Sequence, residues 1–146
     1  MTRSVEVASF LKEFGRWVEQ QPDIEAVALV GSYARDAATR DSDVDLIILT
    51  TAIVRYFQDP TWLSMWGQVE EYRVENWGRV ESLRAFYKGG LEVEYNFSSA
   101  SWAGLPVDAG TRRVVSAGMR IMFDPQGLLQ TLQQEIGSGA ILASNE

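Results

Sequence analysis

The 146-residue sequence contains no cysteine and no histidine. The absence of cysteine excludes disulfide bonds, thiolate zinc sites and cysteine nucleophiles from within this chain. The absence of histidine excludes imidazole general bases and serine–histidine catalytic pairs. Any catalysis by these residues must therefore use carboxylates and bound metal ions.

Long hydrophobic runs are also missing, since no apolar stretch approaches the ~18 residues of a membrane-spanning helix. The beginning of the chain is not a secretory signal or a transit peptide, because its helical pattern is interrupted by charges of both signs. These charged residues are Arg3, Glu6, Lys12 and Glu13. We therefore expect a cytoplasmic protein with no membrane partner.

Basic residues are too few to balance the acidic ones: 13 Lys and Arg stand against 20 Asp and Glu, giving a net charge of −7. This balance argues against a nucleic-acid backbone as the main partner, because such affinity comes from lysine and arginine neutralising phosphates. A cationic small molecule or a protein fits the charge better. The length predicts one domain over residues 1–146, which can bury most of its apolar surface.

The stretch that suggests chemistry begins with two apolar segments, residues 26–30 and 46–49, which read as strands covered on both faces. Gly31 ends the first strand and would let a phosphate approach the backbone closely, and Ser32 offers a hydroxyl. A short helix is predicted over residues 33–38, and its first amides would point at an anion. A nucleotide triphosphate fits this arrangement.

Asp43 and Asp45 alternate with apolar residues at the start of the second strand. This alternation puts both carboxylates on one face about 7 Å apart, from a rise of ~3.3 Å per residue. Magnesium usually takes one or two carboxylates plus substrate phosphates, and two metals can clamp the attacking and leaving oxygens of a displacement at phosphorus. Gly31-Ser32 alone would be explained as a turn, and Asp43 and Asp45 alone as the solvated entry of a strand. The combination of the two motifs at this spacing indicates phosphoryl or nucleotidyl transfer.

Gly31-Ser32, followed after ten residues by Asp43-Val44-Asp45, resembles the signature of the nucleotidyltransferase superfamily related to DNA polymerase β. The segment GSYARDAATRDSDVDL is most similar to the sequences of the small bacterial members of this superfamily, the minimal nucleotidyltransferases and the aminoglycoside adenylyltransferases. The resemblance covers about residues 24–132. It implies an α+β fold, with a mixed sheet of about four or five strands and flanking helices, and Mg²⁺ as cofactor.

Residues 77–97 have an extended pattern interrupted at residues 88–90, Lys-Gly-Gly, which predicts a hairpin turn. A turn this short cannot join parallel strands, so it counts against a doubly wound fold. Residues 91–97 alternate strictly, so Glu92 and Glu94 share one strand face. That face is either solvated or the source of a third carboxylate for the metals.

In streptomycin adenylyltransferases a third acid follows a glycine turn as Gly-x-x-hydrophobic-acid, and Gly90-Leu91-Glu92-Val93-Glu94 is similar to that pattern. The resemblance therefore implies that Asp43, Asp45 and Glu94 hold the metal ions and are catalytic. It also implies that Ser32 and nearby amides bind the β- and γ-phosphates. Glu92 is left free to be solvated, to act as a base or to bind the acceptor.

The remaining elements are predicted from helical spacing, turn residues and capping. An amphipathic helix over residues 4–20 packs on the sheet. An apolar cluster is expected to cover the core, although stacking on a base or binding a partner would use the same side chains: Trp62, Met65 and Trp66. Trp102 is expected to be exposed in a polar loop. The other predictions are helices over residues 52–57, 61–67, 111–117 and 126–136, a strand over 120–123, and fraying of about the last eight residues.

The reaction expected from the resemblance is transfer of a nucleoside monophosphate to an acceptor hydroxyl with release of pyrophosphate, with AMP from ATP as the leading case and another NTP as the alternative donor of its own nucleotide. Aminoglycoside adenylyltransferases carry an additional helical domain that nothing after Ile136 could supply, so an antibiotic acceptor would require a homodimer. The length favours a small helical partner protein as acceptor, whereas the acidic charge and the streptomycin-type details favour a small molecule. The alternative is a non-catalytic nucleotide-binding or antitoxin-type interaction module.

Overall fold

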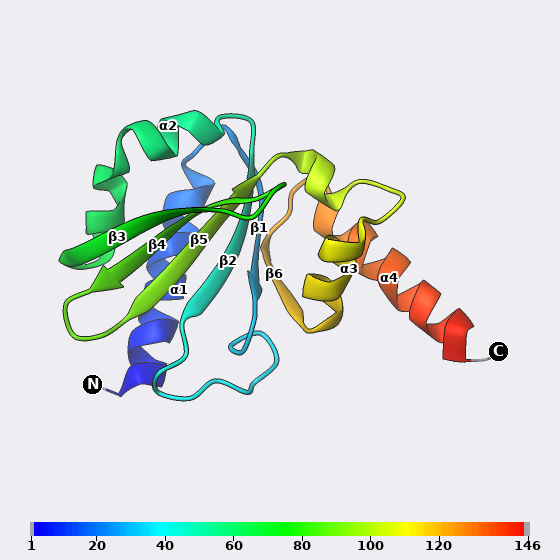
Figure 1. Cartoon of the computed structure of the whole chain (residues 1–146), viewed down its shortest axis with the longest axis horizontal. Helices are drawn as coiled ribbons and strands as arrows, with labels where there is room; N and C mark the ends of the chain where they lie inside the picture. The colour runs from blue at the N-terminus through cyan, green and yellow to red at the C-terminus, as the bar shows by residue number, and fades with distance from the viewer. Residues whose placement is uncertain (1, 145–146) are drawn as a thin grey trace.

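The structure, a computed structural model, describes residues 2–144 and the side chains of residues 2–137. A six-stranded mixed sheet in the order β3-β4-β5-β2-β1-β6 forms its centre, with helices on both faces (Figure 1). Strands β2 and β5 run parallel, and every other neighbouring pair is antiparallel. The strands are β1 (Ile24–Val30), β2 (Val44–Thr50), β3 (Val69–Asn76), β4 (Glu81–Tyr87), β5 (Glu92–Ser98) and β6 (Met119–Phe123).

The predicted α+β class is confirmed, but the expected four or five strands were too few because β3 was missed. Its sequence VEEYRVEN contains no buried residue, and most of its side chains are exposed. It therefore lacks the alternation between buried and exposed positions by which a strand is recognised. Pairing with β4 along the edge of the sheet stabilises β3 instead.

One face of the sheet is covered by α1 (Arg3–Glu19), α2 (Ile53–Gln58) and the 3₁₀ helix η1 (Pro60–Trp66). Phe14 of α1 packs against Tyr95 of β5 with ring centroids 5.8 Å apart, and Trp62 meets the same tyrosine edge-on at 4.8 Å. Trp66 also packs on this core, as expected, whereas Met65 is 59% exposed. The aromatic side chains thus fix α1 and η1 against β5.

The opposite face is covered by η2 (Ala100–Ala103), α3 (Ala109–Ser116) and α4 (Leu128–Ser144). Trp102 is only 3% exposed here, so its predicted exposure was wrong. The 3₁₀ turn η2 directs the indole onto the apolar residues of β1 and β2, and the Thr111 hydroxyl donates to the Trp102 carbonyl at 3.3 Å. A tertiary contact therefore buries a side chain whose surrounding loop is polar.

The last helix begins later and ends later than predicted. The Asp124 carboxylate accepts from the amides of Leu129 at 3.1 Å and Gln130 at 2.9 Å, so it does cap the helix. Residues 125–127 first make a turn, in which Gly127 has φ +72°. The helix then continues to Ser144 instead of ending at residues 137–139, since glycine inside a helix costs only about 1 kcal/mol. Residues 145–146 of the segment expected to fray lie outside the described residues.

Within residues 2–144, none of the helices combines the length and the apolar character that crossing a membrane would require.

Candidate active site

The parallel pairing of β2 with β5 places the predicted carboxylates together. Asp45 lies beside Glu94 in the register, and Asp43 precedes β2 on the same face. Asp43, Asp45 and Glu94 each offer one carboxylate oxygen within 4.8 Å of the others. We call these three residues the acidic triad. Three oxygen ligands this close together suit a hard divalent cation such as Mg²⁺.

The loop after β1 approaches the triad closely. Gly31 has φ +75°, and a Cβ at this position would lie 3.1 Å from Oδ2 of Asp45. Any larger residue would therefore strain the backbone and press on the carboxylate. The sequence prediction that a phosphate could approach Gly31 is compatible with this geometry, and the adjacent Ser32 is partly exposed.

The helix predicted over residues 33–38 was wrong. This segment forms consecutive turns, in which the Ala37 amide donates to the Ser32 carbonyl at 2.9 Å. Asp36 has φ +56°, a left-handed conformation that cannot continue a right-handed helix. An anion at Ser32 would consequently meet the amides of a turn rather than a helix N-terminus.

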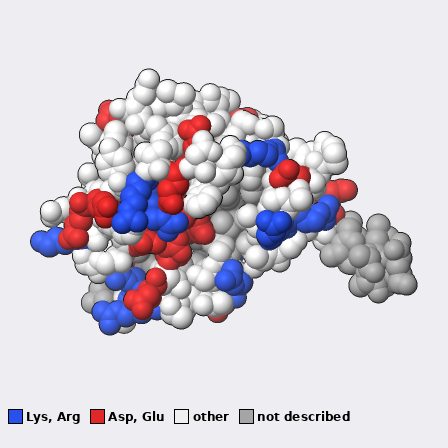
Figure 2. All heavy atoms as spheres, viewed as in Figure 1, with Lys and Arg blue, Asp and Glu red and all other residues white. Residues whose placement is uncertain are grey.

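Arg84 is a component of the site that the sequence analysis missed. Its guanidinium donates to four carboxylates: Glu75 at 2.8 Å, Glu92 at 3.0 Å, Asp43 at 3.3 Å, and Glu94. Glu92 lies on the same strand face as Glu94 but contacts Arg84 instead of completing the triad. On the face shown in Figure 2, acidic and basic side chains gather over the strands β3 to β5 and the start of β2.

Asn96 is the second missed component, and it orients Asp45. Its amide nitrogen donates to Oδ1 of Asp45 and to the Leu46 carbonyl, both at 2.9 Å. Its amide oxygen accepts from the Ser82 hydroxyl at 2.5 Å. Since Asn96 is only 5% exposed, these hydrogen bonds hold one oxygen of Asp45 in a fixed direction.

Two carboxylates of the triad, Asp45 and Glu94, lie in surroundings that raise their pKa values when no cation is bound. Burial, followed by the charge of Asp43, raises the pKa of Asp45. Burial, followed by the charge of Asp45, raises the pKa of Glu94 to about 7, although Arg84 opposes the shift. Burial is the larger shared cause of the two pKa shifts and repulsion between neighbouring carboxylates is the second, and a bound divalent cation would offset that repulsion.

A cavity of about 450 Å³ adjoins the triad. Asp45, Glu94 and Asn96 form its polar side. Its other walls are largely apolar and come from the end of β1, from β2, from the segment before β4, from η2, and from α3 with its C-cap: Val30, Gly31, Ile47, Trp77, Val80, Trp102, Val114 and Ala117, with Arg113 at the same wall. The cavity can therefore hold a ligand that has an apolar or aromatic part beside a group that contacts the carboxylates.

A mixed sheet that carries carboxylates from neighbouring strands next to a Gly-Ser loop defines a nucleotidyltransferase type of fold and site. Residues 9–86 match the model of the nucleotidyltransferase domain family, and the chain belongs to this family. The family and the enzyme class expected from the sequence are thereby confirmed.

Solved structures with a similar fold include an aminoglycoside 6-adenyltransferase from Bacillus subtilis, with 14% identity and a TM-score of 0.50 over 62% of this chain and 34% of that chain. The polymerase core of TRAMP, an RNA surveillance complex, has 17% identity and a TM-score of 0.48 over 63% of this chain and 31% of that chain. A toxin-antitoxin crystallised with AMP-PNP has 11% identity and a TM-score of 0.41 over 99% of this chain and 91% of that chain.

This chain thus spans about a third of the length of the first two structures. The comparison with curated proteins gave no significant match.

Proposed function

We propose that the protein is a Mg²⁺-dependent nucleotidyltransferase that moves AMP from ATP to an acceptor hydroxyl and releases pyrophosphate. The observation that carries this proposal is the approach of the Asp43, Asp45 and Glu94 carboxylates to within 4.8 Å beside Gly31 and Ser32. Membership of the family supports nucleotidyl transfer as the general reaction.

In this reaction the acceptor oxygen forms a bond to the α-phosphorus, the bond from that phosphorus to the bridging oxygen breaks, and pyrophosphate leaves. Asp43, Asp45 and Glu94 would hold the metal ions. Bound Mg²⁺ would supply charge neutralisation at the phosphates. Ser32 and the neighbouring turn amides bind the β- and γ-phosphates. The acceptor proton passes to a carboxylate of the same group, for which Glu94 is the first candidate and Glu92 the second.

The protein's own contribution is mainly positioning. Asn96 directs one oxygen of Asp45, and Arg84 holds Glu94 and Asp43. Carboxylates fixed in this way need little rearrangement when charge develops in the transition state. The cavity beside the triad supports a nucleoside as ligand, because Trp77 lines it, is 59% exposed and offers aromatic surface for a base.

For the acceptor, the electrostatics favour a molecule with positive charge. Glu92 is about one third exposed at the margin of the acidic group, and the chain carries a net charge of −7. An amino group next to the acceptor hydroxyl would be attracted to this carboxylate. An aminoglycoside has this chemistry, and a basic segment of a helical partner protein is the second acceptor that we propose. A homodimer could complete the pocket for a small molecule.

A specific observation favours a second candidate, a nucleotide-binding module without catalysis. Arg84 already binds Asp43 and Glu94, so an internal cation neutralises part of the site without any metal. A module of this kind would bind ATP equally well with and without Mg²⁺. It would also retain that affinity in Asp43→Ala.

Mass spectrometry of candidate acceptors incubated with ATP, Mg²⁺ and the protein tests the proposed reaction. An acceptor whose mass increases by one AMP, with Asp43→Asn showing no product, is the expected result. Absence of transfer to aminoglycosides and to candidate helical partners, together with Mg²⁺-independent ATP binding, would favour the binding module.

A further inference from the structure

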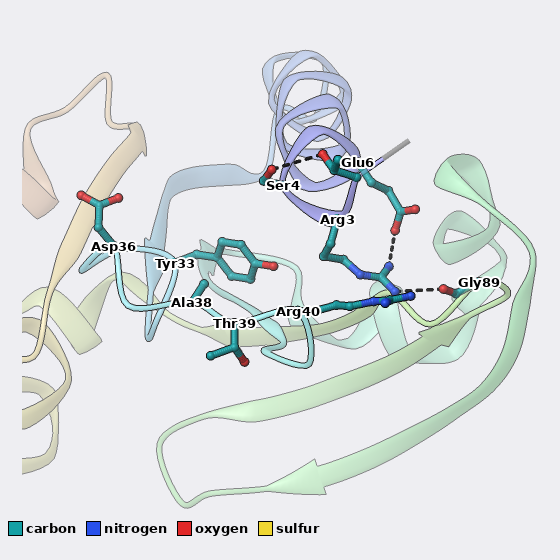
Figure 3. A pocket seen from close by; sticks show the side chains of 10 residues that line it. Arg3, Ser4, Glu6, Tyr33, Asp36, Ala38, Thr39, Arg40 and Gly89 are labelled. Carbon is teal, nitrogen blue, oxygen red and sulfur yellow. Dashed lines mark hydrogen bonds and ion pairs between the residues drawn. The ribbon is translucent and has the colours of Figure 1, made fainter.

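A second cavity, of about 770 Å³, lies between the start of α1, the loop of residues 31–43 and the β4–β5 turn at Gly89 (Figure 3). It is separate from the cavity beside the triad, and none of the triad residues lines it. Its walls carry two arginines, Arg3 and Arg40, and the hydroxyl groups of Tyr33 and Thr39. The same wall also contains two acids, Glu6 and Asp36.

Arg3 is fixed at one end of this cavity. One terminal nitrogen donates to the Gly89 carbonyl at 2.9 Å, and the other pairs with Glu6. The side chain is 14% exposed, and its Nε is too buried to reach a ligand in the cavity. Each terminal nitrogen carries two hydrogens and makes one of these contacts, so Arg3 is held in place and keeps one further donor on each of them.

Arg40 comes from the loop and extends toward the Arg3 end of the cavity in the view of Figure 3. Across residues 2–137, it takes part in none of the ion pairs or side-chain hydrogen bonds. The two acids of the wall already have partners, Glu6 with Arg3 of the same wall and Asp36 with Arg120 outside it at 2.5 Å. The positive charge of Arg40 is therefore not balanced within the cavity.

We propose that this cavity binds a phosphate group, with Arg40 and Arg3 as charged donors and the Tyr33 and Thr39 hydroxyls as neutral donors. Guanidinium groups match the geometry of phosphate oxygens and form strong charge-assisted hydrogen bonds with them. Two guanidinium groups and two hydroxyls offer more donors than the two oxygens of a carboxylate can accept. The volume leaves room for a phosphorylated small molecule as the complete ligand.

The position of the cavity connects it to the active site. Tyr33 and Arg40 belong to the same loop that joins Gly31 and Ser32 to Asp43. A ligand that binds both Arg40 and the fixed Arg3 would restrict this loop. The phosphate has two sources, either the nucleotide and pyrophosphate of the proposed reaction or a different phosphorylated molecule.

Isothermal titration with pyrophosphate in the presence of EDTA tests the site without metal or acceptor, so a failure of nucleotidyl transfer does not affect the result. Arg40→Gln should weaken binding about tenfold, and Tyr33→Phe should weaken it less, because a neutral hydroxyl contributes less than a charged donor. Arg112→Gln is the matched control, since Arg112 is an exposed arginine on α3 outside the cavity, and it should bind like the wild type.

Wild-type affinity in Arg40→Gln, or no binding of pyrophosphate to the wild-type protein at millimolar concentration, would overturn the assignment. Loss of binding in Ser32→Ala together with retention in Arg40→Gln would also overturn it, because the anion would then lie at the Gly-Ser loop. A repeat of the titration with saturating ATP in EDTA identifies the source. If ATP displaces pyrophosphate and Arg40→Gln weakens ATP binding, the phosphate belongs to the nucleotide. If pyrophosphate still binds in the presence of ATP, the cavity takes a separate phosphorylated ligand. Either result supports the phosphate site.

Discussion

Arg84 of β4 lies directly opposite Glu94 of β5 in the antiparallel register, and its guanidinium donates to the Glu94 carboxylate. The same guanidinium contacts Glu75, Glu92 and Asp43. One permanent cation thus stands among carboxylates that would otherwise repel one another. Arg84 supplies part of the charge compensation that the metal ions would complete.

Arg84→Gln should lower the free energy of unfolding of the metal-free protein by about 2 kcal/mol, because four carboxylates lose the guanidinium that donates to them. Added Mg²⁺ should restore part of this loss. Urea unfolding in EDTA and in Mg²⁺ measures both effects. Arg73→Gln on neighbouring β3 is the control: Arg73 is 60% exposed, pairs with Glu71 and lies over the Phe86 ring at 5.0 Å, so its change should stay within about 1 kcal/mol. Equal stability of the two variants would contradict the role of Arg84.

Asp43→Asn and Asp45→Asn should each reduce Mg²⁺-dependent transfer at least about 100-fold while the fold stays intact, because each change removes a negative charge that the cations require. Stability should be unchanged or higher, since repulsion inside the triad is relieved. Pyrophosphate release and thermal unfolding measure these effects. Asp41→Asn serves as the control, because Asp41 is exposed in the same loop and outside the triad. Normal turnover of either triad variant at saturating Mg²⁺ would exclude the metal site.

Glu94→Gln and Glu92→Gln form a matched pair on one strand face. Glu94→Gln should lower kcat by orders of magnitude and change ATP binding little, because Glu94 belongs to the triad. Glu92→Gln should mainly raise KM for the acceptor, because Glu92 lies at the margin of the group and contacts Arg84. Steady-state kinetics with ATP and acceptor varied separately decide this. The opposite pattern, with kcat lost only in Glu92→Gln, would exchange the two roles.

Asn96→Ala should lower kcat about tenfold or more, because Asp45 loses the donor that orients it. The same change should reduce the free energy of unfolding by about 1–3 kcal/mol, since the Ser82 hydroxyl and the Leu46 carbonyl lose a buried partner. Ser82→Ala removes only the far end of this chain of hydrogen bonds and should affect kcat less. Similar kcat values for both variants would argue against orientation of Asp45 by Asn96.

The metal-free protein should become less stable as the pH rises from about 4.5 to about 7, over the range in which Glu94 is protonated in the folded state and ionised in the unfolded state. The folded pKa is raised above the ordinary value of 4.5, so the folded state binds more protons in this interval and the contribution of Glu94 is lost as the pH passes about 7. Urea unfolding in EDTA at several pH values measures the slope. The free energy of unfolding should fall less steeply with pH in Glu94→Gln. The same pH dependence as in the wild type would contradict a raised pKa of Glu94.

The site residues whose position follows from a local pattern of alternation or turn residues were placed correctly from the sequence. Strict alternation over residues 91–97 put Glu94 on the same strand face as Glu92, which the structure confirms, and the turn at residues 88–90 predicted the hairpin. The same hairpin contained an unused signal: positions 84 and 94 are equally distant from Gly89, so pairing around the turn places Arg84 opposite Glu94. Arg84 could therefore have been found by counting residues.

Other features depend on contacts between distant segments and leave no local pattern. Trp102 is buried because the sheet supplies an apolar surface beneath its polar loop. The turn conformation of residues 33–38 depends on the left-handed backbone of Asp36, a residue type that also occurs in helices. Asn96 is an ordinary strand residue by sequence, and only the parallel pairing of β2 with β5 brings it to Asp45.

That parallel pairing also determines when the site can form during folding. Asp45 and Asn96 are 51 positions apart, and β2 and β5 meet only after the intervening segments have been arranged around them. Closing so large a loop is entropically costly, and contacts of this kind form late in slow, non-local folding. A partly folded chain can therefore contain α1 and the β1–β2 pair without the complete triad. The ability to bind a divalent cation tightly should arise only with the native topology, and a metal-sensitive probe would follow the completion of folding itself.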